Sequence, residues 1–350
     1  MTKLTTDYRL LVPELLEHAI VYKQPASGTF ELTNNCNIAC RMCYVRSCTE
    51  QSKELSASEW LILAQDAVDN GMVFLTLTGG EILLRPDFFE IYEPLSHMGL
   101  VLTIFTNGTL ITDEFAKRLT QYPPNLTKIT LYGASRTTYK AITGSADAFN
   151  RCCSGIETFI KRGIPVGLKT TITQQNIDEL ESMQQMARNW GLPITASWLL
   201  SDRRDGKSSE IEKCRLSPQE GVKLESLDHT YKKKWLEARK DFVLKNGNFY
   251  CRAGKATFAV TPSGEMNVCL NLPLPAVHPL KIGFQKAWEL VQLVVETEQP
   301  DESVCDLCDV RGYCQICPAW SYNLDRSLTT PVPYICEIAQ ERKKIHNKGI

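Results

Sequence analysis

Short β-rich runs alternate with helical stretches between about residues 28 and 200, and this alternation restricts the fold more than any other feature of the sequence. We expect the β-rich runs to form six strands: Thr29 to Thr33, Val73 to Thr78, Val101 to Thr106, Lys128 to Tyr132, Val166 to Thr171 and Ile194 to Leu200. Four of these runs follow a stretch that ends in glycine, the residue that most readily adopts the left-handed conformation at a helix C-terminus. The glycines are Gly71, Gly99, Gly163 and Gly191. Strands joined by helices pair in parallel with right-handed crossovers, so the sequence predicts an α/β protein with a partial (β/α)6 TIM-like barrel.

Two helical stretches show how the barrel would be covered. The stretch before Gly71 contains Ser56 and Glu59 at the spacing of a capping box. Its apolar residues recur at helical intervals, as expected of a helix that packs on a sheet. The stretch Asp147 to Arg162 has the same pattern and includes Cys152 and Cys153, which we interpret as small core residues.

The chain has 14 cysteines among its 350 residues and no apolar block of a secretory signal at its start. Cysteines in such a chain are better explained as metal ligands or catalytic thiols than as disulfides. Three are Cys36, Cys40 and Cys43, and seven more lie between residues 251 and 336. The others are Cys48, Cys152, Cys153 and Cys214. This distribution predicts two metal-binding regions.

The charge of the chain excludes some classes of partner. The formal net charge is -1, and no block of like charges is present, so we expect no nucleic acid and no anionic membrane as partners. No apolar run approaches the roughly 18 residues that span a bilayer. We therefore expect a cytoplasmic protein.

The first cysteine group reads Cys-Asn-Ile-Ala-Cys-Arg-Met-Cys and directly follows the first predicted strand. In a barrel of this kind, that position belongs to the catalytic rim. Three thiolates on one loop suit a four-iron cluster in which one iron has no protein ligand. A structural zinc site is the alternative, but it needs a fourth ligand, and the nearest candidate, Cys48, lies on the same short loop.

This C-x3-C-x2-C spacing resembles that of the radical SAM superfamily, in which the amino and carboxylate groups of S-adenosylmethionine (SAM) chelate the open iron. The second predicted strand ends in Thr78, followed by Gly79, Gly80 and Glu81, which resemble the GGE motif of the superfamily. The resemblance implies that the backbone and the acidic side chain of this motif receive the methionine amino group. It implies further SAM contacts at the ends of later strands: Thr106, Asn107, Tyr132, Ser135 and Lys169. Each of these polar residues has the alternative of being merely solvated.

One position departs from the family pattern. Met42 stands where the family usually has an aromatic residue near the adenine ring. Methionine is flexible and polarizable, so it can fill the same space with a softer contact.

The second cysteine group resembles the SPASM domain of peptide-modifying radical SAM enzymes, whose seven cysteines hold two auxiliary four-iron clusters. The resemblance implies an outer cluster ligated by Cys305, Cys308, Cys314 and Cys336, and an inner cluster ligated by Cys251, Cys269 and Cys317. The inner cluster then lacks a fourth cysteine. We expect an open coordination site or a non-cysteine ligand there, and the alternative is closure by Cys214.

The spacing of this group also leaves other interpretations open. Two residues rather than the usual three precede Cys317, which puts the division of ligands between the clusters in doubt. Paired C-x2-C motifs are also typical of zinc ribbons. The absence of a nearby histidine favours iron and sulfur, so the cofactors we expect are three 4Fe-4S clusters and SAM.

The sequence suggests four regions. Residues 1–27 form an N-terminal segment, 28–200 the radical SAM partial barrel, 201–250 a bridging helical region, and 251–350 a SPASM domain with a C-terminal tail. A capped helix is expected near Ser217 to Asn246 in the bridge. The last region has few long apolar segments, so bound metal is expected to replace part of its core.

The family resemblance implies that one electron enters the first cluster and cleaves SAM to a 5′-deoxyadenosyl radical, which abstracts hydrogen from the substrate. Auxiliary clusters suit a substrate radical that must next lose an electron. We therefore expect a maturase of a ribosomally made peptide that forms a thioether or carbon-carbon crosslink or modifies a side chain. The expected partners are the precursor peptide and an electron donor of the flavodoxin or ferredoxin type.

Several alternatives remain open. A sulfatase-maturating oxidase and a small-molecule dehydrogenase belong to the same superfamily, whereas a zinc-stapled binding protein and a pure electron carrier belong to other classes. Fewer than 30 residues precede the first predicted strand, too few for a fused winged-helix leader-binding domain, so we expect any leader recognition to come from Tyr8 to Val21, the bridge or a separate protein. The general base is not identified, although Asp202 and Asp205 follow the sixth strand.

Overall fold

The computed structural model describes residues 8–44, 53–204, 209–227, 251–296, 304–305 and 307–347. Its described strands form one nine-stranded sheet in the order β6-β5-β4-β3-β2-β1-β7-β8-β9. The strands are β1 (Ser27–Glu31), β2 (Phe74–Thr78), β3 (Val101–Thr106), β4 (Leu126–Thr130), β5 (Val166–Thr171), β6 (Ile194–Ser197), β7 (Thr257–Val260), β8 (Met266–Cys269) and β9 (Leu272–Val277). The first six pair in parallel in sequence order, which confirms the predicted (β/α)6 arrangement.

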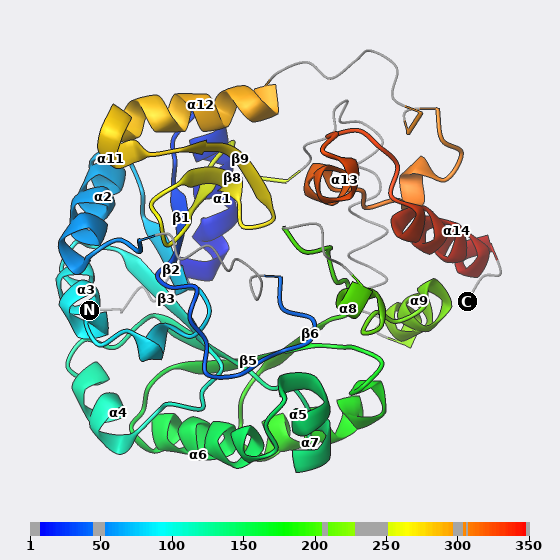
Figure 1. Ribbon diagram of the computed structural model, residues 1–350, viewed down its shortest axis with the longest axis horizontal. Helices are drawn as coiled ribbons and strands as arrows, with labels where there is room; N and C mark the ends of the chain where they lie inside the picture. The colour runs from blue at the N-terminus through cyan, green and yellow to red at the C-terminus, as the bar shows by residue number, and fades with distance from the viewer. Residues whose placement is uncertain are drawn as a thin grey trace, which may run out of the picture.

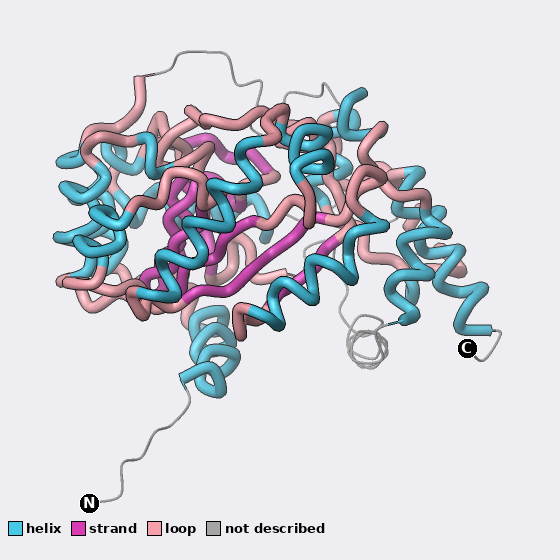
Figure 2. The backbone as a smooth tube through the Cα atoms, turned by 90° about the horizontal axis from the view of Figure 1, so that it is seen from below, coloured by secondary structure: helices cyan, strands magenta, loops and turns pink. Residues whose placement is uncertain are grey.

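Helices cover the outer side of the curved sheet (Figure 1). Those of the barrel and its N-terminal segment are α1 (Tyr8–Val21), α2 (Ala57–Asp69), α3 (Phe88–Ser96), α4 (Asp113–Leu119), α5 (Arg136–Thr143), α6 (Asp147–Lys161) and α7 (Leu180–Asn189). The later ones are α8 (Ser209–Glu212), α9 (Pro218–Leu227), α11 (Pro279–Ile282), α12 (Phe284–Glu296), α13 (Pro318–Asp325) and α14 (Pro333–Asn347). Figure 2 shows the strands enclosed by these helices, with α1 projecting from one side.

Helix α2 begins as its sequence predicts. The backbone N–H of Glu59 donates to Ser56 Oγ at 3.3 Å, and the Ser56 N–H donates to Glu59 Oε2 at 2.8 Å, which completes the capping box. The face that packs on the sheet carries Trp60, Leu63, Ala64 and Ala67, all fully buried. Burial of this apolar face fixes α2 against the barrel.

Helix α6 tests the interpretation of Cys152 and Cys153 as core residues. Cys152 is completely buried, whereas Cys153, one position further round the helix, is only half-buried. Burial raises the pKa of Cys152 to about 12. This thiol stays neutral at physiological pH and fills space in the core.

The second cysteine region does not form a sheet of its own. Strand β7 pairs in parallel with the free edge of β1, and β8 and β9 follow it as antiparallel neighbours. Helix α12 packs on β8 and β9, and the Trp288 Nε1–H donates to the Lys23 carbonyl oxygen at 2.7 Å. The barrel sheet therefore continues through the proposed boundary at residue 251, and the division into four regions stays a prediction.

The bridging region is described in part. Helix α9 lies within the helix expected near Ser217 to Asn246, and the remainder of that expected helix falls outside the described residues. Helix α9 packs on α14 through a buried ion pair between Glu225 and Arg342, whose side chains are 8% and 3% exposed. None of the described helices is long and apolar enough to cross a membrane.

Candidate metal and cofactor site

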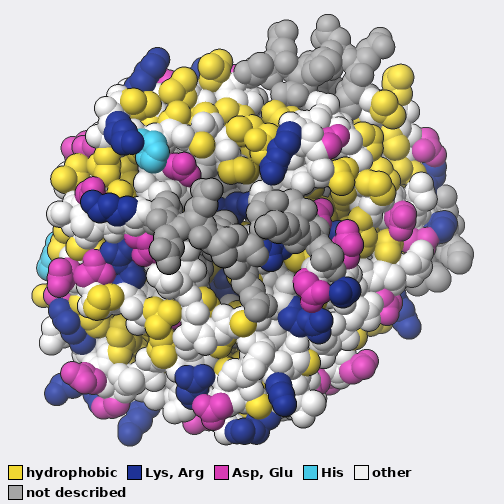
Figure 3. Space-filling model, in the orientation of Figure 1, with side chains coloured by type: hydrophobic (Ala, Val, Ile, Leu, Met, Phe, Trp, Pro, Cys, Tyr) yellow, Lys and Arg dark blue, Asp and Glu magenta, His cyan; other side chains and the backbone are white. Residues whose placement is uncertain are grey.

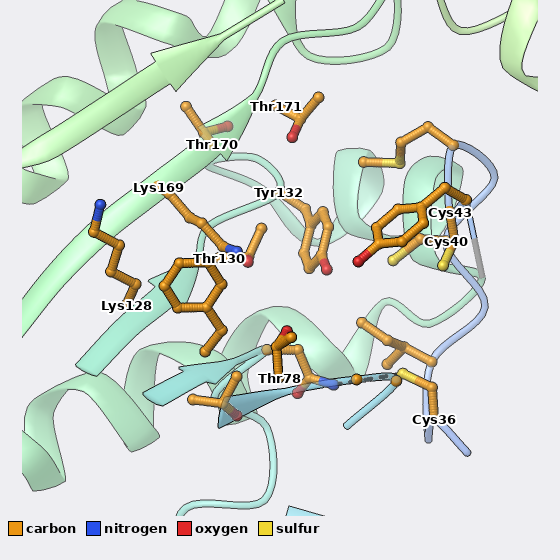
Figure 4. Close-up of a pocket in the computed structure, with 18 of the residues that line it drawn as sticks. Cys36, Cys40, Cys43, Thr78, Lys128, Thr130, Tyr132, Lys169, Thr170 and Thr171 are labelled. Carbon is orange, nitrogen blue, oxygen red and sulfur yellow. Dashed lines mark hydrogen bonds between the residues drawn. The ribbon is translucent and has the colours of Figure 1, made fainter. Parts of the chain in front are cut away.

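A cavity of about 700 Å³ opens at the carboxyl ends of the barrel strands. One wall is the loop that follows β1 and carries Cys36, Cys40 and Cys43. The opposite wall is built from β4, β5 and β6 (Figure 4). The cavity volume falls within the range typical of cofactor sites, and its position is the one expected for a parallel barrel.

All three cysteines of the first group line this cavity. Figure 4 shows them on one side of it, with the Asn107 Nδ2 donor 3.9 Å from Cys36 Sγ. Within the described parts of the chain, no three His, Cys, Asp or Glu side chains converge closely enough to hold a single metal ion. A structural zinc requires such convergence by four ligands, whereas a cluster accepts thiolates at separate corners. The three thiols and the space in front of them therefore fit a four-iron cluster with SAM. Cys48, the candidate fourth zinc ligand, lies outside the described residues.

Gly79 and Gly80 bring the end of β2 against the loop that precedes Cys36. The Gly80 N–H donates to the Thr33 carbonyl oxygen and the Glu81 N–H to that of Asn35, both at 2.7 Å. A Cβ atom on Gly80 would lie 2.2 Å from the Asn35 carbonyl oxygen, and one on Gly79 would lie 2.5 Å from that of Thr33. Gly79 also has φ +145°, which favours glycine. Both glycines line the cavity, and the close approach they permit in this structure is to the cysteine loop.

Glu81 follows the two glycines, and its expected contact with the methionine amino group stays a prediction. It does not line the cavity and is completely buried. Its carboxylate accepts hydrogen bonds from the Thr106 hydroxyl and the Asn107 N–H at 2.7 Å, and from the Leu83 N–H at 3.1 Å. Burial raises the pKa of Glu81, and these hydrogen bonds act in the opposite direction. In this structure the acidic side chain therefore ties the ends of β2 and β3 together.

Ser135 also lies outside the cavity lining, and its expected contact with SAM stays a prediction. Its hydroxyl caps α5 by accepting from the Thr138 N–H at 3.1 Å, and it donates to Glu179 Oε1 at 2.6 Å. Glu179 also accepts from the Ala134 N–H at 2.6 Å. No sequence signal pointed to Glu179, which is remote along the chain, yet its carboxylate positions the loop after β4.

The other predicted SAM contacts, Thr106, Asn107, Tyr132 and Lys169, all line the cavity. The Asn107 amide donates to Asn37 Oδ1 at 2.9 Å and so joins β3 to the cysteine loop. Burial raises the pKa of Tyr132 well above its ordinary value, and the nearby Cys40 adds to this effect. Tyr132 therefore stays a neutral phenol beside the cysteines. The roles of these residues toward SAM remain predictions.

Sequence reasoning missed a buried charge cluster at the end of β1. Glu31 is 1% exposed, and its two carboxylate oxygens accept from Arg204 Nη2 at 2.7 and 2.9 Å. The Tyr44 hydroxyl donates to the same carboxylate at 3.3 Å. This cluster joins the cysteine loop to the segment that follows β6, and such pairing between distant segments has no local sequence signal. Asp202 is also buried and forms an ion pair with Arg215 at 3.0 Å, whereas Asp205 lies outside the described residues.

The cysteines of the C-terminal region fall into two sets by their electrostatic influence on one another. Burial raises the pKa of Cys317 to about 12, with further contributions from Cys269 and Cys251. Burial likewise raises the pKa of Cys314 to about 11, with contributions from Cys336 and Cys305. Cys305 and Cys308 also contribute to the raised pKa of Cys336, for which burial is again the main cause. These sets match the ligand division that the resemblance implies.

Cys214 belongs to neither set. Its thiol is buried, which raises its pKa, and the charged groups that influence it are Arg41 and Glu210. Arg41 lies on the first cysteine loop. This placement disfavours Cys214 as the fourth ligand of the inner set.

Comparison with known proteins connects this site to a family. The family model described as the Radical SAM superfamily matches residues 30–187. The chain is 25% identical over 334 residues to the AdoMet-dependent heme synthase of Methanosarcina barkeri, covering 89% of this chain and 96% of that protein. It is 24% identical over 313 residues to the antilisterial bacteriocin subtilosin biosynthesis protein AlbA of Bacillus subtilis, covering 85% and 68% of the two chains.

A solved structure shares the fold at low sequence identity. The structure of Streptococcus suis SuiB bound to precursor peptide SuiA superimposes with a TM-score of 0.71 and 16% identity, covering 94% of this chain and 79% of SuiB. The matched residues 30–187 contain the first cysteine group, Gly79 and Gly80, and nearly all of β1 to β5. Residues 30–187 of the chain therefore form a radical SAM domain.

Proposed function

We propose that this enzyme matures a ribosomally made peptide by forming a thioether or carbon-carbon crosslink or by modifying a side chain. The observation that carries the proposal is the cavity of about 700 Å³, which has three thiols on one wall and space for a substrate in front of the other. The similarity to a bacteriocin biosynthesis protein and the shared fold with SuiB, which binds a precursor peptide, support it.

Particular residues of the chain would hold the cofactors. Cys36, Cys40 and Cys43 would bind the first cluster, with Gly79 and Gly80 beside them. When bound, the cluster and SAM supply a 5′-deoxyadenosyl radical that abstracts hydrogen from the substrate. The barrel positions the substrate, and the neutral Tyr132 phenol and the Asn107 amide keep the cysteine wall polar without adding charge.

Two auxiliary 4Fe-4S clusters complete the proposal. The outer one takes Cys305, Cys308, Cys314 and Cys336, and the inner one Cys251, Cys269 and Cys317. The two electrostatic sets of thiols support this division. The electron donor is a flavodoxin or ferredoxin, and a separate protein supplies leader recognition where the precursor needs it.

We propose that the inner cluster, if held by Cys251, Cys269 and Cys317 alone, would offer its remaining iron to a cysteine thiolate of the substrate. Cys317 lines a separate cavity of about 350 Å³ together with Asn271, Gln315 and Trp320, which supports access to this cluster. Metal ligation lowers the pKa of a thiol and fixes its sulfur, as thioether formation requires.

Spectroscopy of the variant with Cys36, Cys40 and Cys43 replaced by alanine tests this ligation, because the signals of the first cluster are then absent. We expect a cysteine-containing precursor peptide to change the electron paramagnetic resonance spectrum of the auxiliary clusters, and the matched peptide with serine at that position to leave it unchanged. An identical spectrum with both peptides, or four protein ligands on the inner cluster, would show that the thiolate does not bind there.

The function itself is tested by co-producing the enzyme, under anaerobic conditions, with the short peptide encoded beside its gene. We expect 5′-deoxyadenosine formation that depends on the peptide, together with a peptide mass lowered by one pair of hydrogens if a crosslink forms. The matched control is the variant with alanine at Cys36, Cys40 and Cys43. An unaltered peptide in the presence of active enzyme would refute peptide maturation.

A second candidate is a step in heme synthesis, because the similarity to the Methanosarcina barkeri heme synthase covers 96% of that protein. A sulfatase-maturase-like oxidase and a small-molecule dehydrogenase also remain within the family. Comparing 5′-deoxyadenosine formation with the precursor peptide and with an iron-porphyrin precursor separates the first two. Stoichiometric zinc with negligible iron in freshly isolated anaerobic protein would favour the zinc-stapled binding protein instead.

A further inference from the structure

The barrel cavity has an unbalanced set of charged side chains. Its described lining includes two lysines, Lys128 on β4 and Lys169 on β5, but no aspartate, glutamate, arginine or histidine. Strands β4 and β5 are neighbours, with Lys169 paired to Thr130 and Lys128 to Gly167, so both amines belong to the same wall. Enclosed walls of one charge concentrate the opposite charge in the space before them.

Lys169 is held without a carboxylate partner among the described residues. Its ammonium group lies 3.8 Å from the centroid of the Phe105 ring, and that of Lys128 lies 6.0 Å from it. No described ion pair includes either lysine. Glu81 acts electrostatically on Lys169, but the Glu81 carboxylate already accepts hydrogen bonds from Thr106, Asn107 and Leu83.

Burying the charged ammonium group of Lys169 costs free energy unless a ligand of opposite charge lies beside it. The pKa of Lys169 is lowered to about 8, mainly by burial and also by the positive charge of Lys128, against the opposing effect of Glu81. A contact with an aromatic ring stabilises an ammonium group by less than the cost of removing that group from water. An anion beside the amine would stabilise its charged form and offset this cost.

We propose that Lys169, supported by Lys128, binds a carboxylate of the substrate close to the carbon that reacts. The inference rests on the proposed peptide-modifying function and narrows its substrate to a peptide segment with an Asp or Glu side chain or a free C-terminus. Figure 4 shows Lys128 and Lys169 across the cavity from Cys36, Cys40 and Cys43. The sequence resemblance implied a contact between Lys169 and SAM, and the proposal assigns Lys169 to the substrate instead, because the three thiols that would hold the first cluster lie on the opposite wall.

The test uses reconstituted enzyme saturated with SAM and two probe peptides, acetyl-Gly-Gly-Glu-Gly-Gly-amide and its Gln counterpart. We expect the Glu peptide to bind at least about tenfold more tightly in equilibrium dialysis, since a hydrogen bond to a charged group contributes about 1.5–3 kcal/mol. Lys169→Met should remove this preference, and Lys169→Arg should retain it. The Glu peptide should also raise the pKa of Lys169 followed by nuclear magnetic resonance, because an adjacent negative charge favours the ammonium form.

Lys140→Met is the matched control, since Lys140 is exposed on α5 and away from the cavity lining. It should bind both peptides like the unmodified enzyme. Equal binding of the two peptides at millimolar concentration, or no binding of the Glu peptide, would overturn the proposal. It would also be overturned if Lys169→Met weakened SAM binding about tenfold while leaving the peptide preference intact. Tighter binding of the Glu peptide without modification of any peptide would support the carboxylate site but refute the proposed maturase function.

Discussion

Replacing Cys36, Cys40 and Cys43 together by alanine is expected to reduce 5′-deoxyadenosine formation from SAM to the level of a reaction without enzyme. These three thiols share one wall of the barrel cavity, and no other cysteine among the described residues lines it. Iron and sulfide analysis of anaerobically reconstituted protein should find about twelve irons per chain before the substitution and about eight after it. Chromatographic measurement of 5′-deoxyadenosine gives the activity.

The matched control for this variant is Cys152→Ala, which removes a buried thiol that has no proposed ligand role. The substitution should lower the free energy of unfolding, because alanine fills the buried site less well than cysteine. The iron content and the SAM cleavage of the folded enzyme should stay unchanged. Undiminished 5′-deoxyadenosine formation in the triple variant would contradict the assignment of the first cluster to these cysteines.

Arg342→Met is expected to lower the free energy of unfolding by about 3–5 kcal/mol, because it leaves the Glu225 carboxylate buried without its cation. The guanidinium group donates to Glu225 at 2.6 and 2.9 Å, and to Gln315 Oε1 at 3.0 Å. It thereby holds α14 against α9 and against the loop that carries Cys314 and Cys317. Denaturant titration under anaerobic conditions measures the loss of stability.

An exposed pair on the same helix provides the control. Lys343 bonds Asp309, whose side chain is 81% exposed, so Lys343→Met should cost less than about 1 kcal/mol. The double variant Glu225→Met with Arg342→Met should be less destabilised than Arg342→Met alone, because no charge is then left buried. Equal stability of Arg342→Met and Lys343→Met would mean that the buried pair does not hold the two helices together.

The fold of the barrel could be read from local patterns because each strand and helix carries its own signal. Strands β3 and β5 begin and end at the residues expected from the sequence, and α2 has its capping box. Strands β1 and β4 end two residues earlier than expected, at Glu31 and Thr130. The residues beyond these ends are Leu32, Thr33, Leu131 and Tyr132, which look like strand on composition but belong to the loops that follow the strands. The pairing of β7 with β1 had no local signal, since the two strands are remote in sequence.

The part of the candidate site that could be predicted is the part carried by motifs of fixed spacing, the first cysteine group and the Gly-Gly pair. The cysteines and the two glycines lie together at the cavity as expected. The hydrogen-bond partners of Glu81 and Ser135 could not be predicted from the motif alone, because burial directs their oxygens toward backbone donors and neighbouring side chains. The sequence did not predict that Lys128 lines the cavity, because a lysine within a strand normally faces solvent. Its side chain faces the cavity because the sheet curves into a barrel.

The parallel pairing of β1 with β7 has a consequence for how the protein is made. A ribosome synthesises β1 long before β7, so the nascent barrel emerges with the N–H and C=O groups of one strand edge unpaired. Such an edge is a template for pairing with other chains. Completion of the barrel therefore waits for the segment that also brings Cys251 and Cys269. The exposed edge of β1 is covered only after the ribosome has translated this segment. A chain truncated before β7 is therefore expected to aggregate and not to fold as a smaller radical SAM domain.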